Sequence, residues 1–565
     1  MKILTLHCDY IKFKPLTKAI QKADELSDKN QVEVKEPLVV LIAVETGDAE
    51  AQVNQLTEAV EKTANEVKAK NIVLYPYAHL SSKLAKPEHA QSILQEAEKR
   101  LSKKFKVTKA PFGYYKEFEL KVKGHPLSEL SKEFTALVES RGHDVEDYKP
   151  EQLLKEISRS KLDTSKLKDN DHRILGQKLD LFSFNETAPG MVFWHNNGLI
   201  IYNELIKFAR EQNAKAGYQE ISTPQILDKR LWQISGHWEK YKDNIFLSKY
   251  EDKIVAVKPM NCPGGMLVYK TSTKSYKNLP LRVGEFGTVH RQELSGVLAG
   301  LFRVIKFTQD DAHIFCTEEQ LESEIIKIMN LVDVYFKTFN LPYHVELSTR
   351  PEKRIGDDKI WDKAEKVLEQ VLKKQKVKYK VNKGDGAFYG PKIDFHVKDS
   401  LDRTWQLSTI QVDFAMPERF DLEYIDKNNS RKRPIMLHRA IFGSIERFIG
   451  ILLEHLNGAL PVWLSPTQVR IINFTDKNTK ASEKILDELK KQIPNLRADI
   501  DLESTTVSDK VRNAELQKIP YIIVIGDKEE KSKTLAVRMR GEKPKFGIKP
   551  EDFIRELRGK IEKRI

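Results

Sequence analysis

Residues 291–315 restrict the possible folds of this chain more than any other stretch of its sequence. Two apolar arms with strand-like composition flank a loop that contains Gly296 and Gly300, a pattern that predicts a hairpin. Arg291 and Arg303 lie twelve positions apart on either side of this loop. Such a hairpin can direct a guanidinium group at a phosphate, because the planar guanidinium matches phosphate oxygens with paired hydrogen bonds. A solvated basic hairpin is the alternative interpretation.

The second arm of this hairpin carries a dense group of polar residues in an apolar setting. Its run Gln-Asp-Asp-Ala-His at residues 309–313 is bracketed by Phe307 and Phe315. Buried polar groups need partners, and clusters of them are often functional sites. The bracketing therefore favours a site, although spacing alone leaves both interpretations open.

Length, composition and charge limit the class of protein. A chain of 565 residues has the length of three or four domains. Its 40% hydrophobic and 31% charged residues are typical of a soluble globular protein. Lys and Arg number 95 against 82 Asp and Glu, and the resulting charge of +13 favours a polyanionic partner such as RNA. Many basic proteins bind no nucleic acid, so charge does not decide the function.

The cysteine content predicts the compartment. Cys8, Cys262 and Cys316 are too few for a disulfide framework in a chain of this length, which indicates a reducing environment. No apolar run approaches the roughly 20 residues that a membrane-spanning helix needs. Residues 1–7 have the pattern of a strand and not of a secretory signal peptide. We therefore expect a cytoplasmic protein with no membrane segment.

Residues 1–140 predict a small domain that mixes strands and helices. Short β-rich runs at residues 1–6, 38–44 and 71–77 alternate with two amphipathic patterns. The apolar positions at helical spacing are Val53, Leu56, Val60 and Val67 in the first pattern, and Ile93, Leu94, Ala97 and Leu101 in the second. This alternation indicates an α/β or α+β domain.

Three further segments follow. Residues 141–175 are strongly charged and lack a sustained apolar stripe, which indicates a linker. Residues 176–462 mix strands and helices without repeating βα units, a pattern that favours an antiparallel sheet flanked by helices. Prolines in residues 460–466 mark a boundary, and residues 463–565 predict a compact α/β domain. Its expected elements are strands at 469–474 and 521–525 and helices at 481–493 and 507–517. The expected fold class is multidomain α+β and α/β.

The hairpin at residues 291–315 resembles motif 2 of the class II aminoacyl-tRNA synthetases, in the form found in threonyl-tRNA synthetases. Other stretches match the same family in the expected order. They are residues 188–195 before the core, 218–224 (motif 1), 258–264, 384–395 and 438–447 (motif 3). The match extends from about residue 180 to the C-terminus, and so many separated motifs in one order make coincidence implausible.

The resemblance implies a domain plan and a reaction. Residues 176–462 would form a class II catalytic core on an antiparallel sheet, and residues 463–565 an anticodon-binding domain. Residues 1–140 resemble the editing domain of archaeal-type threonyl-tRNA synthetases, which shares its fold with D-aminoacyl-tRNA deacylases. The implied activity is activation of L-threonine with ATP and Mg²⁺, transfer to tRNA(Thr), and hydrolysis of Ser-tRNA(Thr). Members of this subclass are usually homodimers through motif 1, here around Pro224.

Amino-acid activation needs positioned reactants and neutralised phosphate charge, with no covalent enzyme intermediate. By resemblance, the ATP-binding residues are Arg291 at the α-phosphate, Glu293 at the adenine edge, Arg303 at the distal phosphates, Gln406, Ser444 and Arg447. The expected catalytic residues are Arg291, Arg447 and Lys392. The residues expected to bind threonine are Met260, Gln309, Asp311, Tyr389 and Gln411. For Arg447, a salt bridge on a helix surface is the alternative.

The resemblance also implies a Zn²⁺ ion held by Cys262, His313 and His438. Their spacings match no local zinc-finger pattern, and each residue taken singly is more often a core residue. Three protein ligands leave coordination positions open for the amino and hydroxyl groups of threonine. Valine lacks the hydroxyl and would be rejected by roughly 10⁴–10⁵, whereas serine lacks only a methyl group, worth about 10–200-fold. Editing of serine is therefore required.

The residues that the resemblance places in the editing pocket are His79, Tyr115, Lys116, His125 and Glu129. Lys116 could stabilise an oxyanion, and Glu129 or His79 could orient a water molecule. Packing and turn formation are the alternatives for each. The positions matching anticodon contacts of the family are Arg512, Glu529 and Arg538, and an exposed strand residue is the alternative for Arg538.

Two rival functions stay open at this point. A non-catalytic RNA-binding paralogue would have no need of the arginines and metal ligands that the sequence retains. A synthetase for proline or serine would not need this Cys/His/His set. One departure from the family stands beside the ligands: Gly265 occupies a position where many relatives have His.

Overall fold

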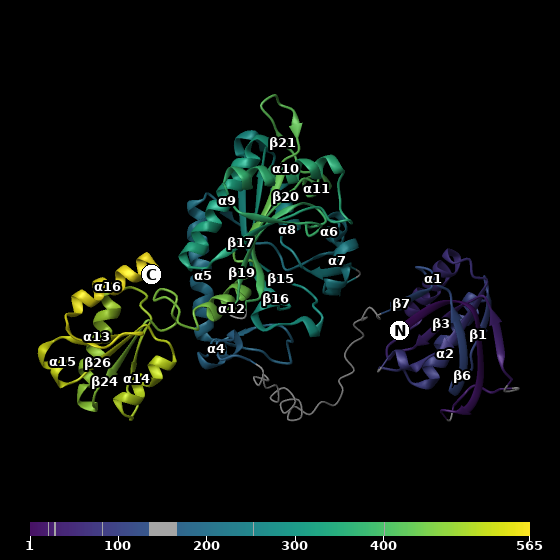
Figure 1. Ribbon diagram of the computed structural model, residues 1–565, viewed down its shortest axis with the longest axis horizontal. Coiled ribbons are helices and arrows are strands. Elements are labelled where there is room, and N and C mark those ends of the chain that lie inside the picture. The colour runs from purple at the N-terminus through teal and green to yellow at the C-terminus, as the bar shows by residue number, and fades with distance from the viewer. Residues whose placement is uncertain are drawn as a thin grey trace. The chain divides into compact units, whose positions relative to one another are not determined.

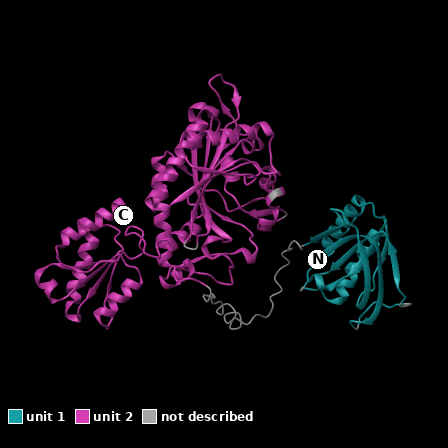
Figure 2. Cartoon of the chain, in the orientation of Figure 1, with its two compact units in different colours: residues 1–146 teal, residues 147–565 magenta. Residues whose placement is uncertain are grey.

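The structure is a computed structural model of the chain (Figure 1). It describes residues 1–20, 22–26, 30–81, 83–134, 167–251, 253–399 and 402–564. The chain divides into two compact units, residues 1–146 and 147–565 (Figure 2). The predicted linker at residues 141–175 lies outside the described residues as far as residue 166.

One long strand organises the N-terminal unit. The strands of this unit are β1 (Lys2–Lys18), β2 (Val32–Lys35), β3 (Pro37–Ala43), β4 (Asn71–Pro76), β5 (Lys106–Lys109), β6 (Tyr114–Val122) and β7 (Glu129–Glu133). The first part of β1 pairs with β3 and β7, and its second part pairs with β2 and β6. The register against β6 shifts between Cys8 and Tyr10, an irregularity that bends a strand and lets β1 belong to two ladders.

Two helices cover one face of this sheet. They are α1 (Glu50–Glu66) and α2 (Pro87–Leu101). All of β3 is buried, because Leu38 and Val40 face the helices while Val39 and Leu41 face the second ladder. Burial on both faces explains the unbroken apolar run of this strand. The predicted strands and both predicted helices of this unit are confirmed, although β1 continues well beyond residue 6.

An eight-stranded sheet forms the centre of the second unit. In sheet order its strands are β10 (Gln219–Glu220), β15 (Leu281–His290), β16 (Lys306–Cys316), β23 (Ile435–Ala440), β20 (Thr404–Asp413), β19 (Lys392–Lys398), β17 (Tyr343–Ser348) and β18 (Tyr379–Asn382). All neighbours are antiparallel except the two edge pairs. The predicted antiparallel core is confirmed, and β15 and β16 are the two arms of the predicted hairpin.

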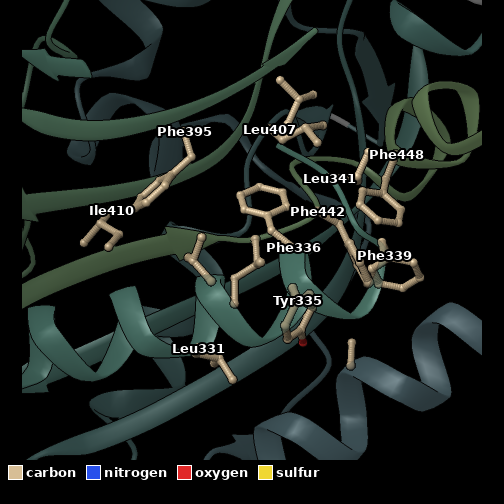
Figure 3. Packing of buried hydrophobic residues seen from close by; sticks show 14 of the residues in the cluster. Leu331, Tyr335, Phe336, Phe339, Leu341, Phe395, Leu407, Ile410, Phe442 and Phe448 are labelled. Carbon is tan, nitrogen blue, oxygen red and sulfur yellow. The ribbon is translucent and has the colours of Figure 1, made fainter. Parts of the chain in front are cut away.

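Helices pack against this sheet through one large apolar cluster. The helices are α5 (Asn196–Lys215), α9 (Glu318–Thr338), α10 (Asp358–Lys374) and α12 (Ile445–His455). The ring of Phe339, which follows the last residue of α9, packs against the rings of Phe442 and Phe448, and Phe336 of α9 belongs to the same cluster (Figure 3). The apolar face of α12, formed by Ile445, Phe448, Ile449 and Leu452, is buried, which fixes the rotation of this helix and therefore the direction of its polar side chains.

The last part of the second unit is an α/β layer with a five-stranded sheet. Its strands, in sheet order, are β25 (Ala498–Asp501), β24 (Val469–Asn473), β26 (Tyr521–Ile525), β27 (Leu535–Met539) and β28 (Lys545–Ile548). Its helices are α13 (Thr479–Gln492), α14 (Val507–Leu516), α15 (Asp527–Ser532) and α16 (Pro550–Lys563). The predicted strands and helices of this part are confirmed.

Shorter elements connect these layers. They are α4 (His172–Lys178), β8 (Phe182–Ser183), β9 (Phe193–Trp194), β11 (Ile226–Asp228), α6 (Lys229–Ile234), α7 (His237–Tyr241), β12 (Leu247–Tyr250), β13 (Lys253–Val257), α8 (Cys262–Tyr269), β14 (Lys274–Ser275), α11 (Ala415–Arg419), β21 (Tyr424–Ile425), β22 (Arg431–Lys432) and the 3₁₀ turns η1 (Ala78–Leu80), η2 (Lys242–Asn244), η3 (Tyr276–Asn278), η4 (Ser295–Val297), η5 (Gly300–Phe302) and η6 (Asp476–Asn478). Within the part of the chain that the structure describes, none of the helices combines the length and apolar character needed to cross a bilayer.

Candidate functional site

A cavity of about 380 Å³ lies against β16, β23 and β20, with α12 beside it. Most of the site residues expected in the second unit line this one cavity. They are Met260, Cys262, Arg291, Glu293, Arg303, Gln309, Asp311, Tyr389, Gln406, Gln411, His438, Ser444 and Arg447. Since these residues come from segments that are far apart in the sequence, the sheet register must bring them together.

Strand pairing places the polar residues in rows on one face of the sheet. His313 of β16 pairs with His438 of β23, which pairs with Gln411 of β20, which in turn pairs with Lys392 of β19. Directly opposed residues share a face, so these four side chains start from the same side. Gln309 and Asp311 precede His313 at two-residue spacing and extend the same face along β16.

Lys392 is in this row but outside the cavity lining. Its ammonium group lies 2.9 Å from the carboxylate of Asp394 and 3.3 Å from that of Asp385. Asp394 is fully buried, and it also accepts a hydrogen bond from Thr409 at 2.9 Å. Lys392 therefore forms ion pairs with carboxylates beside the site, and the catalytic role expected for Lys392 remains a prediction.

Three arginine side chains reach the cavity from two directions. Arg291 follows β15, and its guanidinium lies over the ring of Phe307 at 5.0 Å. Arg303 forms an ion pair with Glu293 at 2.9 Å. Arg447 comes from the first turns of α12 on the other side. Among the described residues, Glu293 is the carboxylate that pairs with these arginines, so their remaining positive charge makes this part of the cavity suited to an anion with several charges.

The guanidinium of Arg447 is held by backbone carbonyls. Its Nε donates to the carbonyl of Phe302 at 2.8 Å, and an Nη donates to that of Gln406 at 3.1 Å. Burial, together with the charges of Arg291 and Arg303, lowers the pKa of Arg447 to about 10. Among the described residues, both hydrogen bonds of this partly buried guanidinium go to neutral carbonyls and it forms no ion pair, so the structure contradicts the alternative of a surface salt bridge. A cation held in this way favours an incoming anion.

Cys262 and His438, which line the cavity, come together with His313. Their potential ligand atoms all lie within 4.8 Å of one another, and the three side chains are buried. Cys262 begins α8, which carries its thiol to the paired histidines of the sheet. Burial raises the pKa of the Cys262 thiol well above its ordinary value, and burial lowers the pKa of His313 to about 4. Without a cation, this group therefore favours a neutral thiol and a neutral imidazole.

The chemistry of this group fits a Zn²⁺ ion. One sulfur and two imidazole nitrogens are ligands that zinc prefers. His313 Nε2 is buried with no hydrogen-bond partner, which is costly unless another group binds there. His438 Nε2 lies 2.8 Å from Asp413, so the other ring nitrogen is left for a metal, as in many carboxylate–histidine–metal arrangements.

A second group has similar ligand spacing but satisfied atoms. Asp171, His172 and Glu454 also place their ligand atoms within 4.8 Å of one another. Both ring nitrogens of His172 have hydrogen-bond partners, and Asp171 forms two hydrogen bonds with the Arg173 guanidinium. This set is a hydrogen-bond network and not a metal site.

Sequence reasoning missed several residues of the site. Thr409 and Tyr241 line the cavity, and Asp413 holds His438. Thr409 and Asp413 flank Gln411 at two-residue spacing, so strand alternation could have identified them. Tyr241 ends a short helix and offers no comparable signal.

Three families match successive parts of the chain. Residues 1–134 match the archaea-specific editing domain of threonyl-tRNA synthetase, and residues 246–456 match the class II core domain of the tRNA synthetases for G, H, P, S and T. Residues 468–560 match the anticodon-binding domain. A crystal structure described as the RNA-binding domain of threonyl-tRNA synthetase from Cryptosporidium parvum is 38% identical with a TM-score of 0.67, over 69% of this chain and 98% of that one. The chain belongs to the threonyl-tRNA synthetase family.

Curated relatives of the same family support this assignment. The threonine–tRNA ligase of Carboxydothermus hydrogenoformans is 52% identical over 395 residues, which is 70% of this chain. The chain spans 62% of the length of that relative. A prolyl-tRNA synthetase from Giardia lamblia has a TM-score of 0.55 over 70% of this chain and 80% of its own, but at 17% identity it shows only a shared fold. The family and fold class expected from the sequence are confirmed.

In the part of the chain that matches the family's editing domain, the ammonium group of Lys116 lies among backbone carbonyls and an aromatic ring. Its ammonium group donates to two backbone carbonyls at 2.9 and 3.1 Å and lies 5.1 Å from the ring centre of Tyr75. Burial lowers the pKa of Lys116 to about 8. The rings of Tyr75, Tyr77 and His79 follow one another at 6.3 and 5.3 Å, so an aromatic row extends from Lys116 to His79. Tyr115, next to Lys116 on β6, is 65% exposed.

The two remaining editing candidates lie near the first part of β1. His125 Nε2 is 2.8 Å from Nδ1 of His7, and Glu129 pairs with Leu6 in the β1–β7 ladder. Lys116 pairs with the second part of β1 through β6. Among the described residues, no hydrogen bond or ion pair connects Lys116 with Glu129, and their membership of one pocket remains a prediction.

The three anticodon candidates lie in the family's anticodon-binding domain. Arg512 is exposed on α14, and Arg538 of β27 forms an ion pair with Glu515. Glu529 accepts a hydrogen bond from the backbone of Gly526 at 3.2 Å and so caps α15. Capping is a structural role, so a role for Glu529 in anticodon recognition remains a prediction.

Proposed function

We propose that this chain is a threonine–tRNA ligase. It activates L-threonine with ATP, transfers the threonyl group to tRNA(Thr), and hydrolyses Ser-tRNA(Thr) in its N-terminal unit. The observation that carries the proposal is that one cavity is lined by Arg291, Arg303 and Arg447 and also by Cys262 and His438, two members of a buried Cys/His/His group. The arginines suit a polyphosphate, and the Cys/His/His group suits a metal that selects an amino acid.

The arginines hold ATP and stabilise the charge that develops during adenylate formation. Arg291 and Arg447 act on the α-phosphate, and Arg303 acts on the distal phosphates together with bound Mg²⁺. Glu293 now pairs with Arg303, so ATP binding exchanges this pair for contacts with phosphate and adenine. Gln406 and Ser444 complete the lining at this end. The reaction then needs no activated nucleophile from the protein, because the threonine carboxylate itself attacks the α-phosphate.

Cys262, His313 and His438 would hold the metal, and Asp413 orients His438. A Zn²⁺ ion bound there would supply Lewis acidity towards the amino and hydroxyl groups of threonine. The chain's own contribution is to hold the substrate amine and hydroxyl from Asp311 and Tyr389. Burial raises the pKa of Tyr389 well above its ordinary value, so its hydroxyl keeps its proton and can donate. Met260, Gln309 and Gln411 line the rest of the amino-acid end.

The N-terminal unit removes serine that the metal cannot exclude. The ammonium group of Lys116 stabilises the oxyanion that forms when water attacks the seryl ester. His79, Tyr115, His125 and Glu129 position the water and the terminal adenosine. The match to the editing domain supports this assignment, and the buried ammonium of Lys116 gives it a chemical basis.

The proposal extends to partners and compartment. The anticodon-binding domain would contact tRNA(Thr) through Arg512, Glu529 and Arg538, and the net charge of +13 suits RNA. We expect a homodimer through the surface around Pro224, because members of this subclass usually form homodimers through motif 1. The three free cysteines, all buried, suit the reducing cytoplasm.

Amino-acid-dependent exchange of pyrophosphate into ATP tests the central proposal. Threonine should support rapid exchange, serine slower exchange, and valine and proline exchange near background. Faster exchange with proline or serine than with threonine would assign the chain to another synthetase. No exchange with any amino acid would favour the non-catalytic RNA-binding paralogue. Metal analysis of the purified protein should find one zinc per chain.

A further inference from the structure

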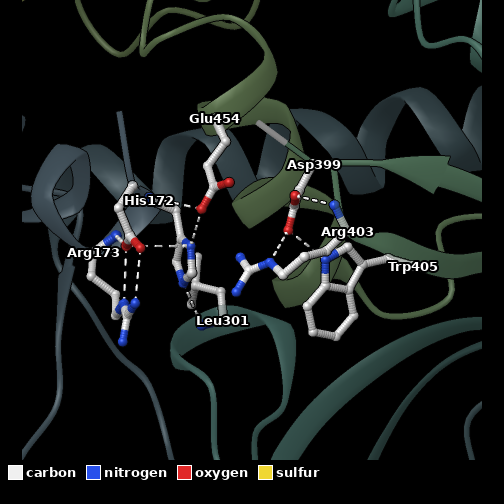
Figure 4. A network of polar contacts seen from close by, with 8 residues as sticks. His172, Arg173, Leu301, Asp399, Arg403, Trp405 and Glu454 are labelled. Carbon is white, nitrogen blue, oxygen red and sulfur yellow. Dashed lines mark hydrogen bonds and ion pairs between the residues drawn. The ribbon is translucent and has the colours of Figure 1, made fainter. Parts of the chain in front are cut away.

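A buried histidine outside the cavity connects the loop of the 291–315 hairpin with helix α12 (Figure 4). His172, the first residue of α4, is 1% exposed. Its Nδ1 lies 2.8 Å from a carboxylate oxygen of Glu454 on α12. Its Nε2 lies 3.0 Å from the backbone nitrogen of Leu301, in the turn η5 that precedes Arg303.

These two contacts define the protonation of His172. The backbone N–H of Leu301 can only donate, so His172 Nε2 must accept and carries no proton. The proton is then on Nδ1, where it is donated to Glu454. The same Glu454 oxygen also accepts the backbone N–H of His172 at 3.2 Å. His172 is thus a neutral imidazole in a single tautomer. It donates to Glu454 of α12 and accepts from the Leu301 N–H of the turn η5.

Gly300 allows the turn to approach the ring this closely. A Cβ atom at this position would lie 2.3 Å from His172 Nε2, and the φ angle of Gly300 is +54°. Both the space and the backbone conformation therefore favour glycine. The contact is built into the backbone of the loop and does not depend on a flexible side chain of the loop.

The same turn orients Arg447. The carbonyl of Phe302 accepts the hydrogen bond from Arg447 Nε at 2.8 Å, one residue after the N–H that His172 holds. The ring of Phe302 also packs against the ring of His172, with centroids 4.3 Å apart. Arg447 and Glu454 are seven residues apart on α12, which places them on one face of the helix two turns apart. The helix therefore contacts the turn at two points, directly through Arg447 and indirectly through His172.

We propose that His172 is a positioning residue for amino-acid activation. By accepting the Leu301 N–H, it fixes the carbonyl that directs Arg447 into the cavity. This inference rests on the proposed function, because Arg447 matters only if the cavity binds ATP. His172 lies outside the three sequence motifs, so the inference adds a residue to those that act in activation. It also gives a role to the hydrogen bonds at both ring nitrogens of His172.

Two substitutions distinguish the donor role of His172 Nδ1 from the acceptor role of His172 Nε2. In His172→Asn, the side-chain amide can replace Nδ1 and donate to Glu454, but nothing replaces the acceptor at Nε2. In His172→Gln, the longer amide can place its oxygen near Nε2 and restore the acceptor. His455→Asn, at an exposed histidine that ends α12, is the matched control. Glu454→Gln is a conservative comparison, because its amide oxygen can still accept from both N–H groups of His172 and keep the proton on Nδ1.

Two readouts follow these variants in the full-length protein. Hydrogen exchange of the peptide containing Leu301 reports the contact itself, independently of activity. Pyrophosphate exchange at varied concentrations of ATP and of threonine reports kcat and the KM for each substrate. We expect His172→Asn to speed hydrogen exchange at Leu301 and to lower kcat about 100-fold, because small displacements of a catalytic group have effects of this size. Glu454→Gln should stay close to the wild type in both readouts. The KM for threonine should stay within twofold, and His172→Gln should recover most of kcat.

The structural alternative predicts a different outcome. If His172 only stabilised the fold, Asn and Gln would lower the melting temperature and all kinetic parameters alike, and the inference would be wrong. Unchanged protection of Leu301 in His172→Asn would also overturn it. Adding His172→Asn to Arg447→Ala should cause no further loss of kcat, whereas independent losses would contradict the proposed route. If the wild type showed no threonine-dependent exchange, the proposed function would fail, while hydrogen exchange would still decide the contact.

Discussion

Asp413 Oδ2 lies 2.8 Å from Nε2 of His438, and both side chains are buried. A carboxylate accepts and does not donate, so it keeps the proton of His438 on Nε2 and leaves Nδ1 as a lone-pair donor. The other oxygen of Asp413 accepts the backbone N–H groups of Ala415 and Met416 at 2.8 and 2.9 Å. The tautomer of His438 is therefore set by a carboxylate that the start of α11 holds in place.

Replacing Asp413 by Asn should weaken metal binding while preserving the fold. The amide oxygen can still accept from Ala415 and Met416, but its nitrogen would donate towards His438 and favour the wrong tautomer. We expect zinc affinity to fall by about 10–100-fold, the usual effect of losing such a partner. Competition with a chromogenic chelator would measure it, with exposed Asp421→Asn as control. Equal affinities of the variant and the wild type would contradict the role of Asp413.

Arg447→Lys should slow threonine activation without unfolding the protein. Lysine keeps the charge but cannot hold two carbonyls and present a planar guanidinium to a phosphate. We expect kcat of pyrophosphate exchange to fall about 10²–10³-fold, the range for loss of one donor to a developing charge. Arg555→Lys, at an exposed site on α16, is the control. A variant with near-normal kcat would exclude Arg447 from the reaction.

Editing should depend on pH through Lys116. Its pKa is lowered to about 8, so the charged form is present below pH 8 and is lost as the pH rises through that value. Hydrolysis of Ser-tRNA(Thr) should therefore decline above pH 8, once spontaneous ester hydrolysis is subtracted. Lys116→Met should accumulate Ser-tRNA(Thr) at all pH values with normal threonine activation. Lys121→Met, on the same strand but 68% exposed, should edit normally. Normal editing by Lys116→Met would refute the assignment.

Ionisation of Glu446 should lower the free energy of unfolding as the pH rises, whereas a carboxylate in a salt bridge would raise it. Burial raises the pKa of Glu446 to about 7, and both of its carboxylate oxygens face the backbone N–H of Thr308. Between pH 4.5 and 7 the folded chain keeps the proton that the unfolded chain loses, so this group lowers stability as the pH rises. Glu446→Gln should remove this penalty.

Urea unfolding at two pH values measures the effect of Glu446→Gln. At pH 8 the variant should be more stable by on the order of 1–3 kcal/mol, and near pH 4 the difference should vanish. Glu483→Gln, at an exposed position on α13, should show no such change. A constant difference at both pH values would point to packing and not to ionisation.

Much of the fold could be predicted because its signals are local. The apolar arms and loop glycines of residues 291–315 predicted the hairpin that β15 and β16 form, and apolar residues at helical spacing predicted α1 and α2. The full extent of β1 could not be predicted, because its second part is stabilised by pairing with distant strands across an irregular register.

The amino-acid sequence by itself determined the domain plan, the hairpin and the family, because periodicity, turn residues and motif order are properties of short segments. Only the tertiary structure decided which side chains meet. Cys262 reaches His313 and His438 through the start of one helix and the register of two strands. Lys392 shares their row, yet its ammonium group is engaged by Asp394. Such outcomes depend on long-range pairing and on competition between partners, which no local pattern encodes.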